Sequence, residues 1–346
     1  MNMNKLKSNT EQKKYIYFKP TDIKPKDDAF HGSLNFLDIE WWYFDAVLEG
    51  GYSLHVGIRT FHIKKQGIVK SRIEVYKNGK ILVEAVKTDP FNKFHISDEI
   101  PLIELDGKRI MELNLEKYKK TGEWSYNITL KIENHAVDLT FTGSTRGWKI
   151  ETSNYNSWAV ALPKAKVSGT MTIDGRSIPV NGIGYHDHNW DYSVVTALKN
   201  IGWLWGRIIG DTLNVVWAKT LITREKHNLL AVINQDGNEN KYFSINPNNI
   251  VFIPRKFVKK NGRWIPMNFV FKMKDSICNT PIDIDIYMET LDIHHSRIFT
   301  AHYWRYHVKT DGYITLGSKT EKIVNKTQII EFLSFKSHGK DIPLKP

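Results

Sequence analysis

Short turn dipeptides recur along this chain and separate segments in which apolar and polar residues alternate. At Asn78-Gly79 the alternating segment Arg72–Tyr76 meets Ile81–Val83, which is the pattern of a β-hairpin closed by a tight turn. Similar dipeptides border apolar runs elsewhere in the chain: Asp106-Gly107, Asp174-Gly175, Gly210-Asp211, Asp236-Gly237 and Asp311-Gly312. Strands joined by short turns predict an all-β protein of antiparallel sandwich or barrel domains. No long amphipathic helix is evident, and Ser193–Asn200 is the candidate for a short one.

The length of the chain, 346 residues, favours two domains, since one domain usually holds roughly 100 to 200 residues. Residues 1–29 are charged and contain Pro20 and Pro25, which predicts a flexible basic leader whose later part lies along the folded body. The alternation of a strand is lost over Asp191–Asn200, so the chain is divided near residue 195. We expect an N-terminal domain of residues 30–195 and a C-terminal domain of residues 196–346.

The formal net charge of +12 comes from Lys residues spread along the chain, without the clustered basic and aromatic motif of a nucleic-acid module. No nucleic-acid partner is therefore predicted, while weak association with an anionic membrane surface stays open. Met1–Lys14 lacks the apolar segment of a secretory signal, and no stretch of about 18 apolar residues predicts a membrane span. The single Cys278 cannot form an intramolecular disulfide and is expected to be buried. These features predict a cytoplasmic protein of unspecified oligomeric state.

The densest group of chemically active side chains lies at Gly182–Trp190. Side chains of an extended strand alternate between two faces. One face would therefore carry His186, His188 and Trp190, and the other would carry Tyr185, Asp187 and Asn189. The segment offers bases beside an indole on one face and an acid beside hydrogen-bonding groups on the other.

Aromatic residues make up 12% of the chain, which is more than core packing usually requires and is typical of a cavity for an apolar ligand. Hydration or cyclisation of an alkene needs a proton donor, shelter for a carbocation and a base. We expect Asp187 to donate the proton if burial keeps it protonated, and His186 or His188 to act as the base. In a pericyclic reaction, the donor of a hydrogen bond to a substrate carbonyl could be Tyr185, Asn189, Tyr303 or Arg305. None of these steps requires a cofactor.

The candidate substrate-binding residues come from several segments: Glu40, Trp42, Asn189, Trp190, Trp203, Trp205, Trp217, Tyr303 and Arg305. Indole rings among them could stabilise a cation, and the polar members could orient a ligand. The structural alternatives stay open at this point. The rings can fill a core, Arg305 can pair with a buried carboxylate such as Glu40, and the histidines with Asp187 can form a buried hydrogen-bond network.

Two histidines on one face also form the beginning of a zinc site. A third ligand would come from one of five other histidines: His55, His62, His294, His295 or His302. None of these lies at a characteristic spacing, so no metal is predicted.

Two segments resemble the signatures of one family. Glu40–Ala46 and Gly184–Trp190, in this order, are similar to motifs of the hydroxyneurosporene synthase (carotenoid 1,2-hydratase) and AttH-like family. The resemblance continues through Trp203–Arg207 and Gly312–Gly317 and covers residues 30–335. It implies two lipocalin-like β-barrel domains packed together, with a hydrophobic pocket at or near their junction. Tocopherol cyclases and fungal Diels-Alderases are more distant proteins that the chain also resembles.

One departure from the family pattern concerns the acid. The hydratases carry a Tyr-x-Asp pattern on the strand after the Trp-x-Trp-Gly segment, whereas this chain has Val215–Lys219 there. The absence of an acid at this place argues against carotenoid hydration as the specific reaction.

Two main hypotheses follow. The first is a cofactor-independent enzyme that acts on a hydrophobic isoprenoid or polyene by acid-base hydration, cyclisation or pericyclic rearrangement in a pocket at the domain junction. The alternative is a carrier of a lipophilic ligand without catalysis. A scaffold protein with a filled, vestigial pocket is a third reading.

Overall fold

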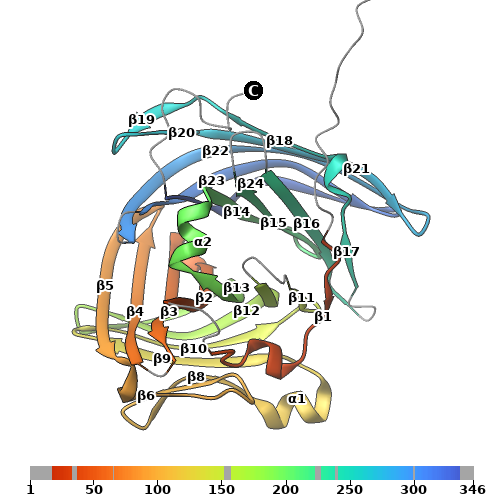
Figure 1. Cartoon of the computed structure of the whole chain (residues 1–346). Helices are drawn as coiled ribbons and strands as arrows, with labels where there is room; N and C mark the ends of the chain where they lie inside the picture. The colour runs from red at the N-terminus through yellow and green to blue at the C-terminus, as the bar shows by residue number, and fades with distance from the viewer. Residues whose placement is uncertain are drawn as a thin grey trace, which may run out of the picture.

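The computed structural model of the chain describes residues 18–32, 37–64, 66–151, 157–222, 227–237, 241–298 and 301–335. It confirms the all-β prediction, because two large antiparallel sheets, A and B, contain most of these residues (Figure 1). The helices of the described part are short: α1 (Leu115–Thr121), α2 (Val194–Lys199) and the 3-10 helices η1 (Pro25–Asp28), η2 (Glu49–Gly51), η3 (Phe91–Lys93) and η4 (Pro247–Asn249). Among these residues, no helix combines the length and the apolar character needed to cross a membrane.

Sheet A is a nearly closed antiparallel barrel in the lower part of Figure 1. Its strands are β1 (Thr21–Asp22), β2 (Asp38–Leu48), β3 (Tyr52–Ile63), β4 (Gln66–Lys77), β5 (Lys80–Pro90), β6 (Phe94–Ile96), β7 (Leu102–Leu105), β8 (Lys108–Leu113), β9 (Ser125–Ile132), β10 (His135–Gly143), β11 (Trp148–Ile150), β12 (Ser157–Ile173) and β13 (Arg176–Ser193). The order is β5-β4-β3-β2-β13-β12-β10-β9-β8-β7-β6, with β1 and β11 paired beside β12. In this order β2 and β13 are adjacent, although far apart in sequence.

Sheet B arches over the barrel in the upper part of Figure 1. Its strands are β14 (Gly202–Ile209), β15 (Leu213–Leu221), β16 (His227–Gln235), β17 (Tyr242–Ser244), β18 (Ile250–Arg255), β21 (Asn268–Ile277), β22 (Thr280–Ile298), β23 (Ala301–Leu316) and β24 (Lys319–Ser334). Their order is β17-β16-β15-β14-β24-β23-β22-β21-β18, and β19 (Val258–Lys260) and β20 (Arg263–Ile265) form a separate hairpin. In the middle of this order, the first strand of the sheet along the chain, β14, pairs with the last, β24.

Most of the predicted turns join neighbouring strands. Asn78 and Gly79 have positive φ angles of 50° and 84° and connect β4 to β5, as the hairpin prediction requires. The prediction of a turn at Asp311-Gly312 is wrong, because both residues lie inside β23. The pairing of β23 with β24 is irregular between Thr310 and Gly312, and on the other side a Cβ on Gly312 would lie 2.0 Å from the carbonyl oxygen of Asp285 on β22. This glycine allows two strands to approach closely instead of reversing the chain.

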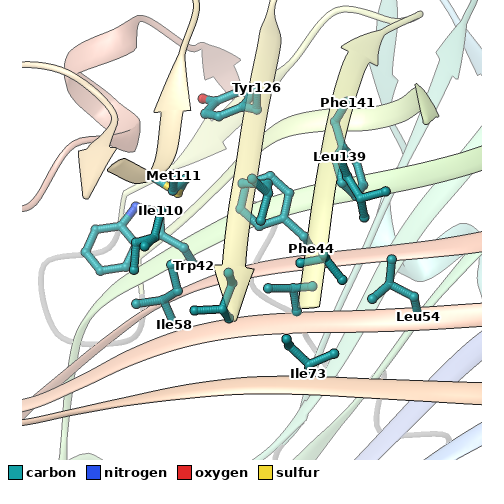
Figure 2. Close-up of a cluster of buried hydrophobic side chains, with 14 of the residues drawn as sticks. Trp42, Phe44, Leu54, Ile58, Ile73, Ile110, Met111, Tyr126, Leu139 and Phe141 are labelled. Carbon is teal, nitrogen blue, oxygen red and sulfur yellow. The ribbon is translucent and has the colours of Figure 1, made fainter. Parts of the chain in front are cut away.

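Strand β2 has two buried faces. Figure 2 shows Trp42 and Phe44 in the barrel core, packed with residues such as Leu54 of β3. The intervening side chains, including Trp41 and Tyr43, join a separate cluster that also contains residues of sheet B. Alternation along one strand thus provides both the barrel core and the contact with sheet B.

The two boundaries expected from the sequence, near residues 29 and 195, both fall in segments with regular structure or buried residues. The later part of the expected leader lies against the body, since β1 pairs with β11 and Asp28 of η1 is buried. Residues 1–17 lie outside the described residues. The boundary near residue 195 falls in α2, which is the predicted short helix and has Ser193 as its N-cap. The expectation that Cys278 is buried is wrong, because it lies exposed in the turn between β21 and β22.

Candidate active site between the two sheets

A cavity of about 800 Å³ lies between sheets A and B. Its lining comes from β2, β3, β4, β12 and β13 on one side and from β14, β15, β16, β23 and β24 on the other. The sequence-predicted residues that line it are Asp187, Asn189, Trp203, Trp205 and Tyr303. Trp42 also borders the cavity, but its ring lies in the barrel core, stacked on His188. The cavity therefore brings together predicted residues from both halves of the chain.

The register of sheet A arranges part of this lining in rows across β13, β2, β3 and β4. Partners in a row lie on one face of the sheet. One row consists of Asp187, Tyr43, Gly57 and Arg72, and the next consists of Asn189, Trp41, Arg59 and Lys70. Because Gly57 has no side chain, the first row leaves space in its middle.

Asp187 is the carboxyl group at the β13 end of the first row. Its Oδ2 accepts hydrogen bonds from Tyr185 Oη (2.7 Å) and Trp158 Nε1 (2.8 Å), and its Oδ1 accepts one from Asn189 Nδ2 (3.3 Å). Burial raises the pKa of Asp187 from 3.8 to about 7, although the bonds from Tyr185 and Trp158 oppose this rise. Asp187 therefore exchanges a proton near neutral pH.

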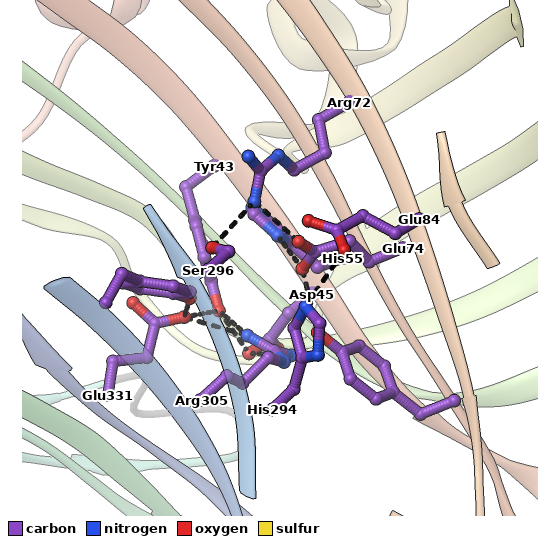
Figure 3. Close-up of polar contacts among 12 residues, drawn as sticks. Tyr43, Asp45, His55, Arg72, Glu74, Glu84, His294, Ser296, Arg305 and Glu331 are labelled. Atoms are coloured by element: carbon purple, nitrogen blue, oxygen red, sulfur yellow. Dashed lines mark hydrogen bonds and ion pairs between the residues drawn. The ribbon is translucent and has the colours of Figure 1, made fainter. Parts of the chain in front are cut away.

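A second carboxyl group, Glu331 of β24, also lines the cavity. Its Oε1 accepts hydrogen bonds from Tyr43 Oη (2.7 Å), Tyr303 Oη (2.5 Å) and Arg305 Nη1 (2.8 Å), as Figure 3 shows for Tyr43 and Arg305. Burial raises the pKa of both phenols well above 10, so they remain protonated donors at neutral pH. Glu331 is thus held by three donors on one oxygen.

Arg305 also connects the two sheets through Asp45 of β2. Arg305 Nη2 lies 3.4 Å from Asp45 Oδ2, and Arg207 Nη2 lies 2.7 Å from Asp45 Oδ1. The three side chains are almost completely buried. Arg305 therefore pairs with Asp45 and Glu331 and not with Glu40, the partner considered from the sequence.

Arg72, at the β4 end of the first row, is bound by Glu74. Arg72 Nη1 lies 2.6 Å from Glu74 Oε1, and His55 Nδ1 lies 2.9 Å from Oε2 (Figure 3). Burial disfavours the ionised form of Glu74, but His55 and Arg72 hold its pKa below the ordinary range. Glu74 also lies with Glu84 and His294 in a group whose possible ligand atoms are within 4.8 Å of one another. Because both Glu74 oxygens already bond to the chain, this group is not arranged to receive a metal.

The two histidines of the central motif lie on the opposite face of β13, in the barrel interior. His186 Nδ1 donates to the Tyr43 carbonyl oxygen (3.0 Å), and its Nε2 hydrogen-bonds to Asp28 Oδ2 (2.9 Å). His188 Nε2 hydrogen-bonds to Glu40 Oε1 (2.8 Å). Burial lowers the pKa of His188 and raises that of Glu40 to about 8, so both are neutral at pH 7. The two histidines therefore lie on the opposite face of β13 from Asp187, as the alternation predicts, and are not part of the cavity lining, although one of them was expected to act as the base.

The other predicted residues lie outside the cavity lining. Trp190 stacks on His31 with ring centroids 4.0 Å apart, and Trp217 packs against Phe252 in the core of sheet B. Tyr185 is fully buried and reaches the site through the hydroxyl that donates to the carboxyl group of the first row. The alternating motif is therefore shared between two separate environments.

Several lining residues were missed by the sequence analysis. Trp41 and Tyr43 could have been found, because they flank Trp42 and must face the opposite side of the strand. Arg59 and Trp158 carry no local signal. They reach the site only through strand pairing over long sequence separations.

Comparison with known proteins supports the fold. No profile of a known protein family matches the chain. Among curated proteins, the quinolone epoxide rearrangement protein penF of Penicillium thymicola is 28% identical over 96 residues, which are 28% of this chain and 26% of that protein. The match therefore spans about a quarter of the length of that relative.

Three solved structures resemble the chain along most of its length. AttH of Nitrosomonas europaea superposes with a TM-score of 0.61 at 14% identity, covering 91% of this chain and 97% of that one. CghA in complex with Sch210972 gives 0.58 at 11% identity, covering 94% and 96%. Kievitone hydratase of Nectria haematococca gives 0.58 at 11% identity, covering 94% and 99%. The chain thus has the lipocalin-like fold of AttH-like proteins, which confirms the resemblance in its two motifs at the level of the fold.

Proposed function

We propose that this protein is a cofactor-independent enzyme in which Asp187 transfers a proton to a small hydrophobic substrate held between the sheets. The supporting observation is that Asp187 is buried, lines an aromatic cavity and has a pKa raised to about 7 by burial. A carboxyl group with this pKa is protonated in a large fraction of molecules at neutral pH. General acid catalysis requires a donor of this kind.

The two oxygens of Asp187 have different partners. Oδ2 accepts two short hydrogen bonds, from Tyr185 and Trp158, whereas Oδ1 accepts one long bond from Asn189, so we assign the transferable proton to Oδ1. When Oδ1 gives its proton to the substrate, these two bonds become charge-assisted and stabilise the carboxylate. The carboxylate then takes back a proton from the attacking water or from a carbon next to the cation, and the acid is regenerated.

Aromatic rings around the cavity are suited to a positively charged intermediate. Trp41 and Trp203 lie nearly parallel (4°) with centroids 6.1 Å apart, and Tyr43 meets Trp205 at 5.5 Å. Each ring face stabilises a nearby cation by about 0.5–2 kcal/mol. Isoprenoids and polyenes form tertiary or allylic cations on protonation, so we propose them as the substrate class.

The names of two similar proteins describe reactions that fit an acid. Kievitone hydratase is named for the addition of water, and penF is named for the rearrangement of a quinolone epoxide. Protonation activates an alkene for water and opens an epoxide. A buried acid in the shared fold is therefore consistent with both names.

For His186 and His188 we replace the proposed catalytic role by a positioning role. Their bonds to Asp28 and Glu40 fix β13 from the barrel side. They act on the cavity only through the strand that carries Asp187.

A carrier without catalysis is the second candidate. The observation in its favour is that both oxygens of Asp187 already accept hydrogen bonds from the chain, as in a purely structural network. The open volume of the cavity argues against the third reading, a scaffold with a filled pocket.

Turnover of candidate substrates separates these functions. The protein is incubated with kievitone and with a quinolone epoxide, and products are analysed by liquid chromatography and mass spectrometry. Asp187→Asn should lower the rate by about 100-fold or more, because general acids contribute on that order. Asp138→Asn, an exposed carboxyl on β10, is the matched control and should keep the wild-type rate. Equal rates for Asp187→Asn and wild type would contradict the acid role, and binding without turnover would favour the carrier.

A further inference from the structure

Arg59 is a guanidinium group in the cavity wall that has no carboxylate partner. Throughout the described part of the chain it forms no ion pair or hydrogen bond, and its contact is the Trp41 ring, 5.2 Å from Cζ to the ring centroid. Arg297 also lines the cavity and has no carboxylate partner among the described residues, but it is exposed to solvent. Three other arginines near the cavity are paired. Arg72, Arg207 and Arg305 each lie within 2.8 Å of a carboxylate oxygen.

An unpaired charge in an apolar cavity is unfavourable. Burial, together with the nearby charge of Arg72, lowers the pKa of Arg59 from 12.5 to about 10, so it remains a cation at neutral pH. The charge of Glu331 opposes this shift, but Glu331 forms its ion pair with Arg305. Buried charges in proteins are usually paired, and leaving one without a partner is costly. The missing partner of Arg59 is therefore to be sought in the ligand.

Tyr192 supplies a second donor without a partner. Its side chain lines the cavity with only 4% of its surface exposed, and its hydroxyl has no hydrogen-bond partner among the residues that the structure describes. The ring meets Trp41 at 5.6 Å and Trp203 at 5.7 Å, both edge to face. Burial raises the pKa of Tyr192 well above 10, although Arg59 opposes this, so the hydroxyl stays a donor. A charged donor and a neutral donor thus lie together among aromatic rings.

We propose that the ligand of this cavity is an amphiphile with a carboxylate or other acidic oxygen group, bound by Arg59 and Tyr192, and an apolar part that reaches Asp187. The inference rests on the proposed function for the site and adds the class of substrate. The register gives the distance between the two ends. Asp187 and Arg59 are separated by two strand spacings and one row, so their Cα atoms lie roughly 12 Å apart. The anionic group and the reacting group therefore lie at different ends of the ligand.

A fluorescent polyene acid tests this inference. cis-Parinaric acid and its methyl ester share the same polyene chain, and the ester replaces the negative charge of the head group by a methyl group. Their affinities can be measured by fluorescence titration. Wild type should bind the acid at least about tenfold more tightly than the ester, because hydrogen bonds to a charged group are worth this much. Arg59→Gln should bind acid and ester equally, and Arg59→Lys should retain part of the preference. Arg176→Gln, an exposed residue of β13 outside the cavity lining, is the matched control and should keep the full preference.

The outcomes separate this inference from the proposed function. A preference for the acid below about twofold in wild type, or one that persists in Arg59→Gln, overturns the inference. Failure of both probes to bind wild type also overturns it. The comparison of acid and ester in wild type needs no variant, so it holds even if Arg59→Gln fails to fold. Asp187→Asn should still bind parinaric acid more tightly than its ester while losing turnover. The proposed catalytic role of Asp187 can therefore fail while the proposed anion site at Arg59 stands.

Discussion

Replacing Asp187 with Asn should stabilise the protein at pH 8 and do so progressively less as the pH falls. The folded-state pKa is about 7, whereas the ordinary value is 3.8. Below pH 3.8 the group is protonated in both states and burial has no ionic cost. Between these values only the folded state holds the proton, so the unfolding free energy falls as pH rises, and above about pH 7 the loss is complete. The difference between the two pKa values corresponds to about 4 kcal/mol at high pH.

Urea unfolding of both proteins at pH 5 and pH 8 measures this effect. Asn is nearly isosteric and keeps an oxygen for the bonds from Tyr185 and Trp158, so the variant removes mainly the ionisation. The stability difference between variant and wild type should grow by about 2–3 kcal/mol from pH 5 to pH 8. Glu40, whose pKa burial raises to about 8, titrates in both proteins and cancels. A difference that is the same at both pH values, as expected for the exposed control Asp138→Asn, would refute the buried-acid reasoning.

Two further predictions concern the sheet contact and the cavity. Arg305→Met should lower the unfolding free energy by about 3–5 kcal/mol. The reason is that the buried carboxylate of Asp45 loses one of its two cationic partners. Urea unfolding measures this loss, with Arg109→Met as the control, because Arg109 forms an exposed ion pair with Glu112 worth about 1 kcal/mol or less. Equal losses of unfolding free energy in the two variants would contradict a stabilising role for the buried pairs of Arg305. Gly57→Leu should weaken cis-parinaric acid binding about tenfold by filling the middle of the first row. Its Cβ would lie 3.1 Å from His55 Nε2, so a small ring shift suffices, and an unchanged affinity in fluorescence titration would place the ligand elsewhere.

The hairpins of the fold could be predicted because their signals are local. Asn78-Gly79 adopts the positive φ angles that its residue types favour, and the strands on either side pair as expected. Asp311-Gly312 has the same appearance in sequence but lies at an irregularity of strand pairing, since the neighbouring strand decides its geometry. The pairing of β2 with β13 joins residues more than a hundred positions apart, and no local pattern encodes it.

The sequence predicts which side chains of β13 share a face, but not which of the two faces borders the cavity. Alternation correctly groups His186 with His188 and Asp187 with Asn189. Which face meets the cavity depends on Asp28 and its neighbours, which enter the barrel from the N-terminal segment. Arg59 was missed because nothing in its own segment distinguishes it from a surface arginine.

The buried pairs of Asp45 with Arg207 and Arg305 affect how a ligand enters and leaves. Moving the two sheets apart would separate these charges, at a cost of several kcal/mol. Wide hinge opening is therefore disfavoured, and we expect a ligand to enter and leave by local side-chain motion. A cavity between two sheets that do not move apart is rigid, so we expect it to discriminate between ligands by shape. Substitutions where the ligand enters should change its residence time more than the rate of the catalysed step.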